Sequence, residues 1–150
     1  NFTEYNYDKK APRKRGFFLE KLKNINLVRT SPYPGFPTDA QSIIMSVLSV
    51  ASGTGMVIEN IFDGRFKHAE ELKKMGADIT VDGRCAVVKG VQNLYGARVN
   101  APDLRSGAGL VVAGLCAKGV TEVSNIYYIE RGYEDIVGDL KRLGALITKI

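Results

Sequence analysis

Apolar residues recur at helical spacing in some stretches of residues 27–90 and alternate with polar residues in others, which predicts helices and strands in turn. The first helix follows Thr38, and we expect Thr38 and Gln41 to form a capping box at its start. A second helix, beginning near His68, ends at Gly76, because glycine adopts the positive φ of a helix C-terminus without strain. The stretch therefore predicts the order strand, helix, strand, helix, strand.

The same order of elements recurs over residues 91–150, so the chain contains an internal repeat. Repeats of this kind stack on their neighbours to bury apolar helix faces. We interpret residues 27–90 and 91–150 as two repeat units of one partial domain, and residues 1–26 as the remnant of a preceding unit. Matching residues keep their order in both units: Asp39 with Asp103, Arg65 with Arg131, and Gly76 with Gly144.

Local signals add detail to the two units. Asp82-Gly83 separates two short alternating runs, which predicts a tight hairpin. Residues 104–118 are apolar on most faces, so we expect a buried helix there. The second unit is then expected to close with a helix that ends at Gly144 and a strand at residues 146–148. The predicted fold class is α/β.

Composition limits the class of protein. No apolar run reaches the roughly 18 residues that a membrane helix needs, so we expect no membrane partner. The sequence starts at Asn1 without a signal-peptide pattern, which suggests a piece of a longer cytoplasmic protein. Cys85 and Cys116 lie in apolar surroundings without metal-ligand spacing, which predicts two buried thiols in a reducing compartment rather than a catalytic or bridged pair.

The net charge of +5 is unevenly distributed along the chain. A basic cluster near the start can mark nucleic-acid binding, but it is also typical of a solvated segment or of a rim that attracts anionic substrates. No aromatic RNA-binding motif or zinc spacing accompanies the cluster, so we expect no nucleic-acid partner. Its members are Lys9, Lys10, Arg13, Lys14, Arg15, Lys21 and Lys23.

Unusual polar motifs stand at the unit boundaries, namely residues 29–41, 59–68, 103–105 and 131–134. Their order and spacing resemble those of the bacterial UDP-N-acetylglucosamine enolpyruvyl transferases, from about residue 26 to the end of the chain. The resemblance implies an inside-out α/β barrel of repeated βαβαββ-like units, with helices inside and sheets outside. About two units and a remnant would be present here.

The resemblance also implies a reaction. The family transfers the enolpyruvyl group of phosphoenolpyruvate to the 3′-hydroxyl of UDP-N-acetylglucosamine and releases phosphate, in the first committed step of peptidoglycan synthesis. The implied partners are these two small molecules and the missing N-terminal portion of the same enzyme, which supplies a mobile loop with further ligands. The implied chemistry needs no metal or other cofactor. Without the mobile loop, we expect the chain alone to be inactive.

Several residues depart from the family pattern, and two alternatives stay open. The departures, at Lys67, residues 106–109, Tyr128 and Glu130, indicate a divergent member or a paralogue with a modified acceptor. One alternative is an enzyme like 5-enolpyruvylshikimate-3-phosphate synthase, which shares the fold and the transferred group. The other is a non-catalytic binding module of the same fold. The motifs around residues 37–39 and 103–105 favour the nucleotide-sugar enzyme.

Asp39 is the candidate catalytic base. A carboxylate that is partly desolvated and close to a hydroxyl can remove its proton. By resemblance, Asp39 matches the residue of the family that contacts the 3′-hydroxyl. The alternative is that Asp39, in a first helical turn, only stabilises the positive end of the helix dipole.

Asp103, Arg105 and Arg131 are candidate substrate-binding residues. Arg105 lies near a helix N-terminus, where a cation opposes the dipole, so we expect it to pair with Asp103 and line a cleft, or to form only a local pair. Arg131 is expected on a loop just before a helix and, by resemblance, contacts phosphoenolpyruvate. The alternative is a surface arginine paired with a neighbouring carboxylate, Glu134 or Asp135.

Ile61 and Phe62 complete the candidate site. By resemblance they contact the nucleotide sugar through backbone and ring, and the alternative is core packing. Arg65 is either a cleft cation or a solvated one. His68, the only histidine, is expected to cap or pack at the start of a helix rather than to bind a metal.

Overall fold

A computed structural model describes residues 3–5 and 22–150, so all but Lys23 of the basic cluster lie outside the described residues. None of the helices in these residues has the length and apolar character that a bilayer crossing requires. The elements, in chain order, are β1 (Thr3–Tyr5), β2 (Leu27–Arg29), the 3-10 helix η1 (Thr38–Ala40), α2 (Gln41–Leu48), β3 (Thr54–Ile58), α3 (Lys67–Lys74), β4 (Asp78–Asp82), β5 (Cys85–Lys89), β6 (Arg98–Asn100), α4 (Leu104–Cys116), β7 (Thr121–Ser124), α5 (Tyr127–Glu130) and α6 (Ile136–Arg142).

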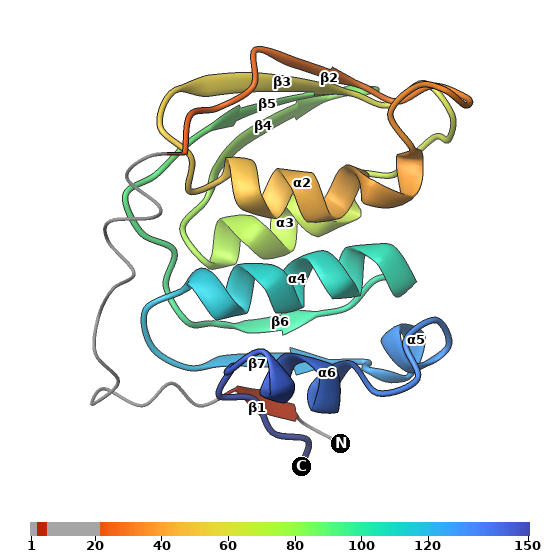
Figure 1. The fold of residues 1–150 in the computed structure, drawn as a ribbon. Helices are drawn as coiled ribbons and strands as arrows, with labels where there is room; N and C mark the ends of the chain where they lie inside the picture. Colours follow the sequence, from red (N-terminus) through yellow and green to blue (C-terminus); the bar gives the residue numbers. More distant parts are fainter. Residues whose placement is uncertain (1–2, 6–21) are drawn as a thin grey trace.

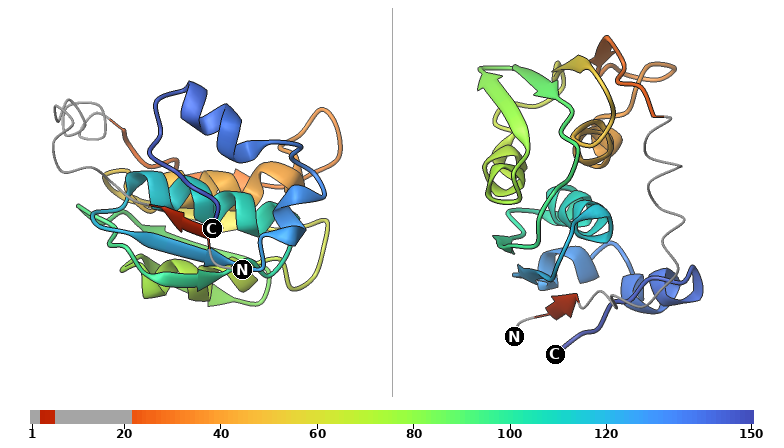
Figure 2. Two further views of the ribbon diagram at one scale, coloured as in Figure 1. Left: turned by 90° about the horizontal axis from the view of Figure 1, so that it is seen from below. Right: turned by 90° about the vertical axis from the view of Figure 1, so that its left-hand side faces the viewer.

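The main helices lie inside and the sheets outside (Figure 1). One sheet has the strand order β2-β3-β5-β4, and the other has the order β1-β7-β6. Helices α2, α3 and α4 lie between the two sheets, and the right-hand view of Figure 2 shows these helices end-on. Buried side chains from both sheets and from the three helices form one core. The predicted inside-out α/β arrangement is therefore confirmed.

A strand–helix–strand crossover occurs twice. β2 and β3 are parallel and joined through α2, and β6 and β7 are parallel and joined through α4. After β3, the strands β4 and β5 form a hairpin whose last pair joins Asp82 to Cys85, and Gly83 in its turn has a φ of 54°. β5 lies antiparallel to both β3 and β4. This arrangement confirms the hairpin and gives the predicted βαβαββ order.

The second sheet is completed in another way. β1, from the start of the chain, pairs antiparallel with β7, with Thr3 opposite Val123. β1 therefore has the place beside β7 that β5 has beside β3. The predicted strand at residues 146–148 is wrong, because this segment joins neither sheet of the described residues. The segment packs instead, and Ile147 is buried in the core.

Small residues let α2 and α4 approach each other closely. Ser46 Oγ donates a hydrogen bond to the carbonyl of Gly109 at 2.8 Å, and Ser42 Oγ donates to the carbonyl of Arg105 at 2.7 Å. A Cβ at Gly109 would lie 2.9 Å from the carbonyl oxygen of Ser42, so a larger residue would force the helices apart. The contact holds the starts of α2 and α4 next to each other at one end of the molecule (Figure 1).

Most predicted helix ends are confirmed. α3 and α6 end shortly before Gly76 and Gly144, which have φ values of 90° and 87°. The middle of α4 is buried, as its apolar composition predicted. The capping box of Thr38 and Gln41 is wrong, because Thr38 lies within η1 and neither η1 nor α2 has a side-chain cap. Thr38 Oγ1 donates instead to Glu59, which lies across the end of the sheet.

Candidate active site

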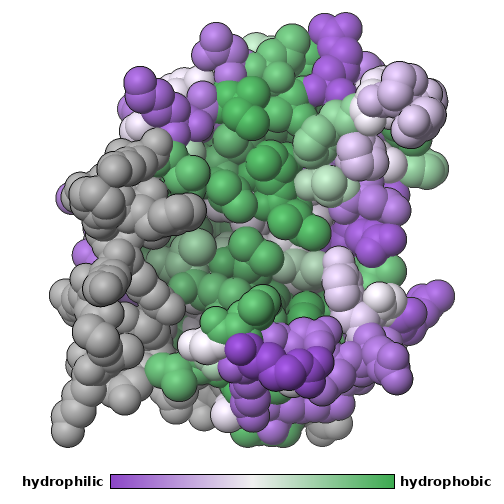
Figure 3. Space-filling model, viewed as in Figure 1, coloured by the Kyte–Doolittle hydropathy of each residue, from purple (hydrophilic) through white to green (hydrophobic). Residues whose placement is uncertain are grey.

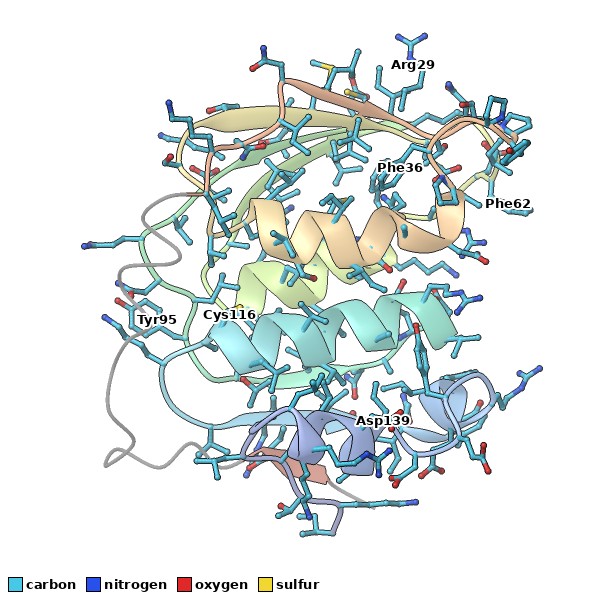
Figure 4. All side chains as sticks on the ribbon, viewed as in Figure 1. Arg29, Phe36, Phe62, Tyr95, Cys116 and Asp139 are labelled. Atoms are coloured by element: carbon cyan, nitrogen blue, oxygen red, sulfur yellow. The ribbon has the colours of Figure 1, made fainter. Side chains whose placement is uncertain are left out.

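An open hollow of about 470 Å³ lies between the loop that follows β2 and the loop that follows β3. It is at the end of the molecule where α2 and α4 begin, and Phe62 marks this end in Figure 4. Asp39, Ile61 and Phe62, three of the predicted site residues, line it together. The full lining consists of Ser31, Pro32, Tyr33, Pro37, Thr38, Asp39, Ile61, Phe62 and Arg65.

Asp39 and Arg105 meet beside this hollow. Arg105 Nη2 lies 3.1 Å from Asp39 Oδ2, and the two side chains are 33% and 56% exposed, respectively. The side chain of Tyr133 and then that of Asp39 raise the pKa of Arg105, so the guanidinium stays charged. A permanent cation therefore adjoins the candidate base.

Asp103 does not pair with Arg105, so that prediction is wrong. As the N-cap of α4, its carboxylate accepts hydrogen bonds from the amide and from the hydroxyl of Ser106, both at 2.8 Å. Capping satisfies a helix amide that has no partner within the helix, which explains why the carboxylate turns toward Ser106. Asp103 thus fixes the start of α4, and Arg105 reaches across to Asp39.

Glu59 is a residue of this region to which the sequence analysis gave no role. It is 1% exposed. Its Oε1 accepts from Thr30 Oγ1 at 2.9 Å and from the amides of Ile61 and Phe62 at 2.8 and 3.1 Å, while Oε2 accepts from Thr38 Oγ1 at 2.8 Å. Burial raises the pKa of this carboxyl, but the hydrogen bonds outweigh burial and lower the pKa overall. The available signal was an acidic residue directly after an apolar strand, where a buried charge needs partners.

Phe62 and Arg65 form an aromatic–cation pair on the same wall of the hollow. Arg65 Cζ lies 4.6 Å from the centroid of the Phe62 ring. Phe62 is 49% exposed, so core packing does not explain it. Ile61 is half-buried and lines the hollow. The pair presents a flat apolar face next to a positive charge.

Arg131 does not stand at a helix start, so that prediction is wrong. It follows α5 directly, and α6 begins only at Ile136, with Asp135 as its N-cap. Within the described part of the chain, Arg131 is exposed and forms no ion pair. The next residue, Gly132, packs against Leu104, and a Cβ there would lie 2.7 Å from the Leu104 methyl carbons. The loop that carries Arg131 therefore lies against the start of α4 (Figure 1).

His68 packs in the interior, one of the two roles expected for it. It lies in α3 and is 1% exposed, and its ring nitrogens form no regular hydrogen bond with any residue that the structure describes. Burial lowers the pKa of His68 to about 4, although the charge of Asp103 and the backbone of Arg65 oppose the shift. The imidazole is therefore neutral near pH 7 and takes no part in the hollow.

The two cysteines lie outside the hollow. Neither forms a disulfide. Both are half-buried, whereas the sequence predicted buried thiols. Figure 4 places Cys116 at the end of the molecule opposite to Phe62. Among the residues that the structure describes, no group of three His, Cys, Asp or Glu side chains is placed to hold a metal ion.

The arrangement is suited to a ligand with hydroxyl groups and negative charge. The Asp39 carboxylate can accept a proton or a hydrogen bond from a hydroxyl. Arg65 and Arg105 supply guanidinium groups, which bind phosphates and carboxylates in bidentate fashion. Phe62 adds an exposed ring for the apolar face of a planar or sugar ring.

Comparison with sequences of known function gives consistent results. The chain is 51% identical over 131 residues to UDP-N-acetylglucosamine 1-carboxyvinyltransferase 1 of Clostridium perfringens, an alignment that covers 87% of this chain and 31% of that protein. It is 58% identical over 122 residues to UDP-N-acetylglucosamine 1-carboxyvinyltransferase of Desulfofundulus thermocisternus, covering 81% of this chain and 50% of that protein. The chain therefore spans only about a third to a half of the length of these relatives.

Solved structures show the same fold. The enolpyruvyl transferase NikO from Streptomyces tendae superposes with a TM-score of 0.76 at 31% identity, covering 85% of this chain and 30% of that one. EPSP synthase from Acinetobacter baumannii superposes with a TM-score of 0.67 at 17% identity, covering 86% of this chain and 31% of that one, which shows the fold alone. Residues 6–140 match the sequence model of EPSP synthase (3-phosphoshikimate 1-carboxyvinyltransferase). The chain thus belongs to the EPSP synthase family of enolpyruvyl transferases.

Proposed function

We propose that this chain is part of a cytoplasmic enzyme that transfers the enolpyruvyl group of phosphoenolpyruvate to the 3′-hydroxyl of UDP-N-acetylglucosamine, the first committed step of peptidoglycan synthesis. The observation that carries this proposal is the Asp39–Arg105 pair at the edge of the hollow. The names of the relatives at 51% and 58% identity support the same acceptor. Because the chain spans only part of those relatives, we propose that it does not turn over alone.

In the proposed reaction, Asp39 takes the proton of the sugar hydroxyl. The sugar oxygen then forms a bond to C2 of phosphoenolpyruvate while C3 takes up a proton from a general acid of the remaining portion of the enzyme, which gives a tetrahedral intermediate. The bond between C2 and the bridging oxygen of the phosphate group then breaks, phosphate leaves, and C3 loses a proton, which restores the double bond. Asp39 is suited to this role because its carboxylate is half-exposed at the hollow, within reach of a bound hydroxyl.

The other predicted residues are given roles around the same centre. Arg105 and Arg131 bind the anionic groups of phosphoenolpyruvate, since both guanidinium groups belong to segments that meet at the start of α4. Asp103 completes this side by holding the first turn of α4. Ile61 and Phe62 contact the nucleotide sugar from the opposite wall of the hollow.

The remaining portion of the enzyme is proposed to cover the apolar face that Figure 3 shows over α2 and α4. Contiguous apolar patches are rare on monomeric soluble proteins, so such a face favours a protein neighbour over solvent. We propose no nucleic-acid or membrane partner. The half-buried apolar side chains of the two helices include Ile43, Ile44, Val47, Val112 and Leu115.

An NMR titration with UDP-N-acetylglucosamine tests the proposal. We expect amide shifts clustered at residues 38–41, 61–62 and 103–105, and weaker shifts in Asp39→Ala. Shikimate 3-phosphate serves as the competing ligand, and equal or larger shifts from it would support the alternative acceptor. If neither ligand binds at millimolar concentration, even with the remaining portion of the enzyme added in trans, the proposal is wrong and a non-catalytic module is favoured. Phosphate release in that mixture is the positive result.

A further inference from the structure

The carboxylate of Glu59 connects the two walls of the hollow. Its Oε1 is held by the amides of Ile61 and Phe62, in the turn that forms one wall. Among the residues that the structure describes, Oε2 accepts only from Thr38 Oγ1, and Thr38 is the residue before Asp39 on the other wall. One side chain therefore spans from the turn at residues 61–62 to the turn that carries the candidate base.

The strand–helix–strand crossover does not by itself require a buried charge at the end of its second strand. A buried carboxylate costs free energy unless hydrogen bonds compensate for lost hydration. In the second crossover, β7 ends at Ser124 and is followed by Asn125, and neither side chain carries a charge. The second copy thus forms the same parallel strand pair without a carboxylate at this point. The charge at Glu59 is therefore explained by the two turns that its hydrogen bonds connect, rather than by the fold.

We propose that Glu59 is a positioning residue that fixes the distance between Asp39 and the Ile61–Phe62 turn, so that a sugar nucleotide contacts both at once. The inference takes its ligand from the proposed function. The distance between Asp39 and the Ile61–Phe62 turn, however, is a property of the ligand-free chain. Asp39 has no hydrogen bond to Glu59 among the described contacts, so Glu59 acts on it only through Thr38. Hydrogen bonds to a carboxylate are short and directional, which suits them to hold a turn in place.

Thr38→Val is the sharpest test, because it removes one link and leaves the three bonds to Oε1 intact. In ligand-free spectra, we expect altered amide shifts and faster exchange at residues 38–41, with the amides of Ile61 and Phe62 unchanged. The affinity for UDP-N-acetylglucosamine is expected to fall about tenfold, the effect of losing one charge-assisted hydrogen bond. Thr121→Val is the control, since it is the same substitution at a threonine of β7 that neither lines the hollow nor bonds to Glu59. It is expected to change neither readout.

Glu59→Gln and Glu59→Ala complete the set. The glutamine oxygen can accept from Ile61 and Phe62 while its NH₂ donates to Thr38 Oγ1, so we expect this variant to retain most of the affinity. The alanine variant is expected to disturb both turns. An unchanged turn at residues 38–41 in Thr38→Val, with only the melting temperature lowered, would show a merely structural role and overturn the proposal. Absence of ligand binding by the unsubstituted chain together with the remaining portion of the enzyme would count against the proposed function, whereas the ligand-free spectra would still decide the role of Glu59.

Discussion

The two halves of the fold, residues 27–90 and 91–150, share one crossover but use the ends of their strands differently. In the first half, β3 leads into Glu59, whose hydrogen bonds connect the loops around the hollow. In the second half, β7 ends at Ser124, whose hydroxyl bonds to the carbonyl of Val99 and the side chain of Asn100. The repeated crossover supplies a scaffold, whereas the polar residues that follow its strands give only the first half the candidate site.

The halves also divide the candidate chemistry between them. The first half carries the carboxylate of Asp39 and the lining of the hollow. The second half contributes the cation Arg105, which reaches Asp39 across the contact between α2 and α4. The candidate site therefore depends on both halves. Substitutions in the first half and in the second half should have different effects on activity and stability.

The largest effect is expected from Asp39→Asn, which removes the proton acceptor without changing the size of the side chain. In the enzyme reconstituted with its remaining portion, we expect kcat to fall by roughly 10²–10⁴-fold, the usual contribution of a general base. The counterpart in the second half, Asp103→Asn, is the control, because asparagine also caps helices well. We expect it to lose about tenfold or less. Equal losses in the two variants would contradict the division of roles between the halves.

A second large effect is expected from pH, through His68 at the junction of α3 and α4. Its folded-state pKa of about 4 is below the ordinary 6.5, so the unfolded chain binds the proton more readily. Stability is therefore complete above about pH 6.5 and falls as the pH drops toward 4, by a total of about 3 kcal/mol. Denaturant unfolding at pH 7 and pH 5 measures the upper part of this loss. His68→Phe removes the proton-linked step, and an unchanged pH dependence in that variant would refute the assignment.

Local patterns in the sequence were enough to predict much of the fold. The helices, the hairpin at Asp82-Gly83 and the turns at Gly76 and Gly144 follow from short-range periodicity and from the φ that only glycine adopts easily. Asp39, Ile61 and Phe62, which the polar motifs singled out as candidate site residues, line one hollow in the structure. These features depend on residues close together in the chain, or on the family resemblance, which already implies the fold.

Two of the errors share another cause, since each involves a side chain that found a distant partner or a closer local one. Thr38 donates to Glu59 across the sheet instead of capping its own helix. Arg105 pairs with Asp39, and Asp103 caps α4. Sequence spacing cannot rank such competing hydrogen bonds, because their geometry is set by the packing of α2 against α4.

That packing is tested by Gly109→Ala, for which we expect a smaller loss. The added Cβ would lie 2.9 Å from the carbonyl oxygen of Ser42, so α2 and α4 must separate. Overpacking exceeds the gain in helix propensity, and we expect a net loss of about 1–2 kcal/mol in the free energy of unfolding. Gly114→Ala, on the same helix, is the matched control. Its Cβ would lie 3.3 Å from the side chain of Thr121, a contact that a shift of a few tenths of an ångström relieves, so any loss of stability should be smaller than in Gly109→Ala. Equal destabilisation of both variants would show that the site of closest approach is elsewhere.

The smallest expected effect concerns two buried threonines, one in each half. Thr30 is 0% exposed, and its hydroxyl donates to Glu59 and accepts from the amide of Asn60. Thr121 is 1% exposed, and none of the described residues forms a hydrogen bond with its hydroxyl. A buried hydroxyl without a partner destabilises the folded state, and valine has nearly the same shape with no polar atom to bury.

Thr121→Val should therefore raise the free energy of unfolding by about 0.5–1 kcal/mol, whereas Thr30→Val should lower it. Parallel denaturant titrations of the two variants measure the difference, and β-branching is conserved in both, so strand propensity does not interfere. The same substitution thus gives opposite signs in the two halves, because only the first half uses its threonine to hold a charged network. A loss of stability in Thr121→Val would mean that its hydroxyl has a partner after all, and the second half would then be polar at its strand start as well.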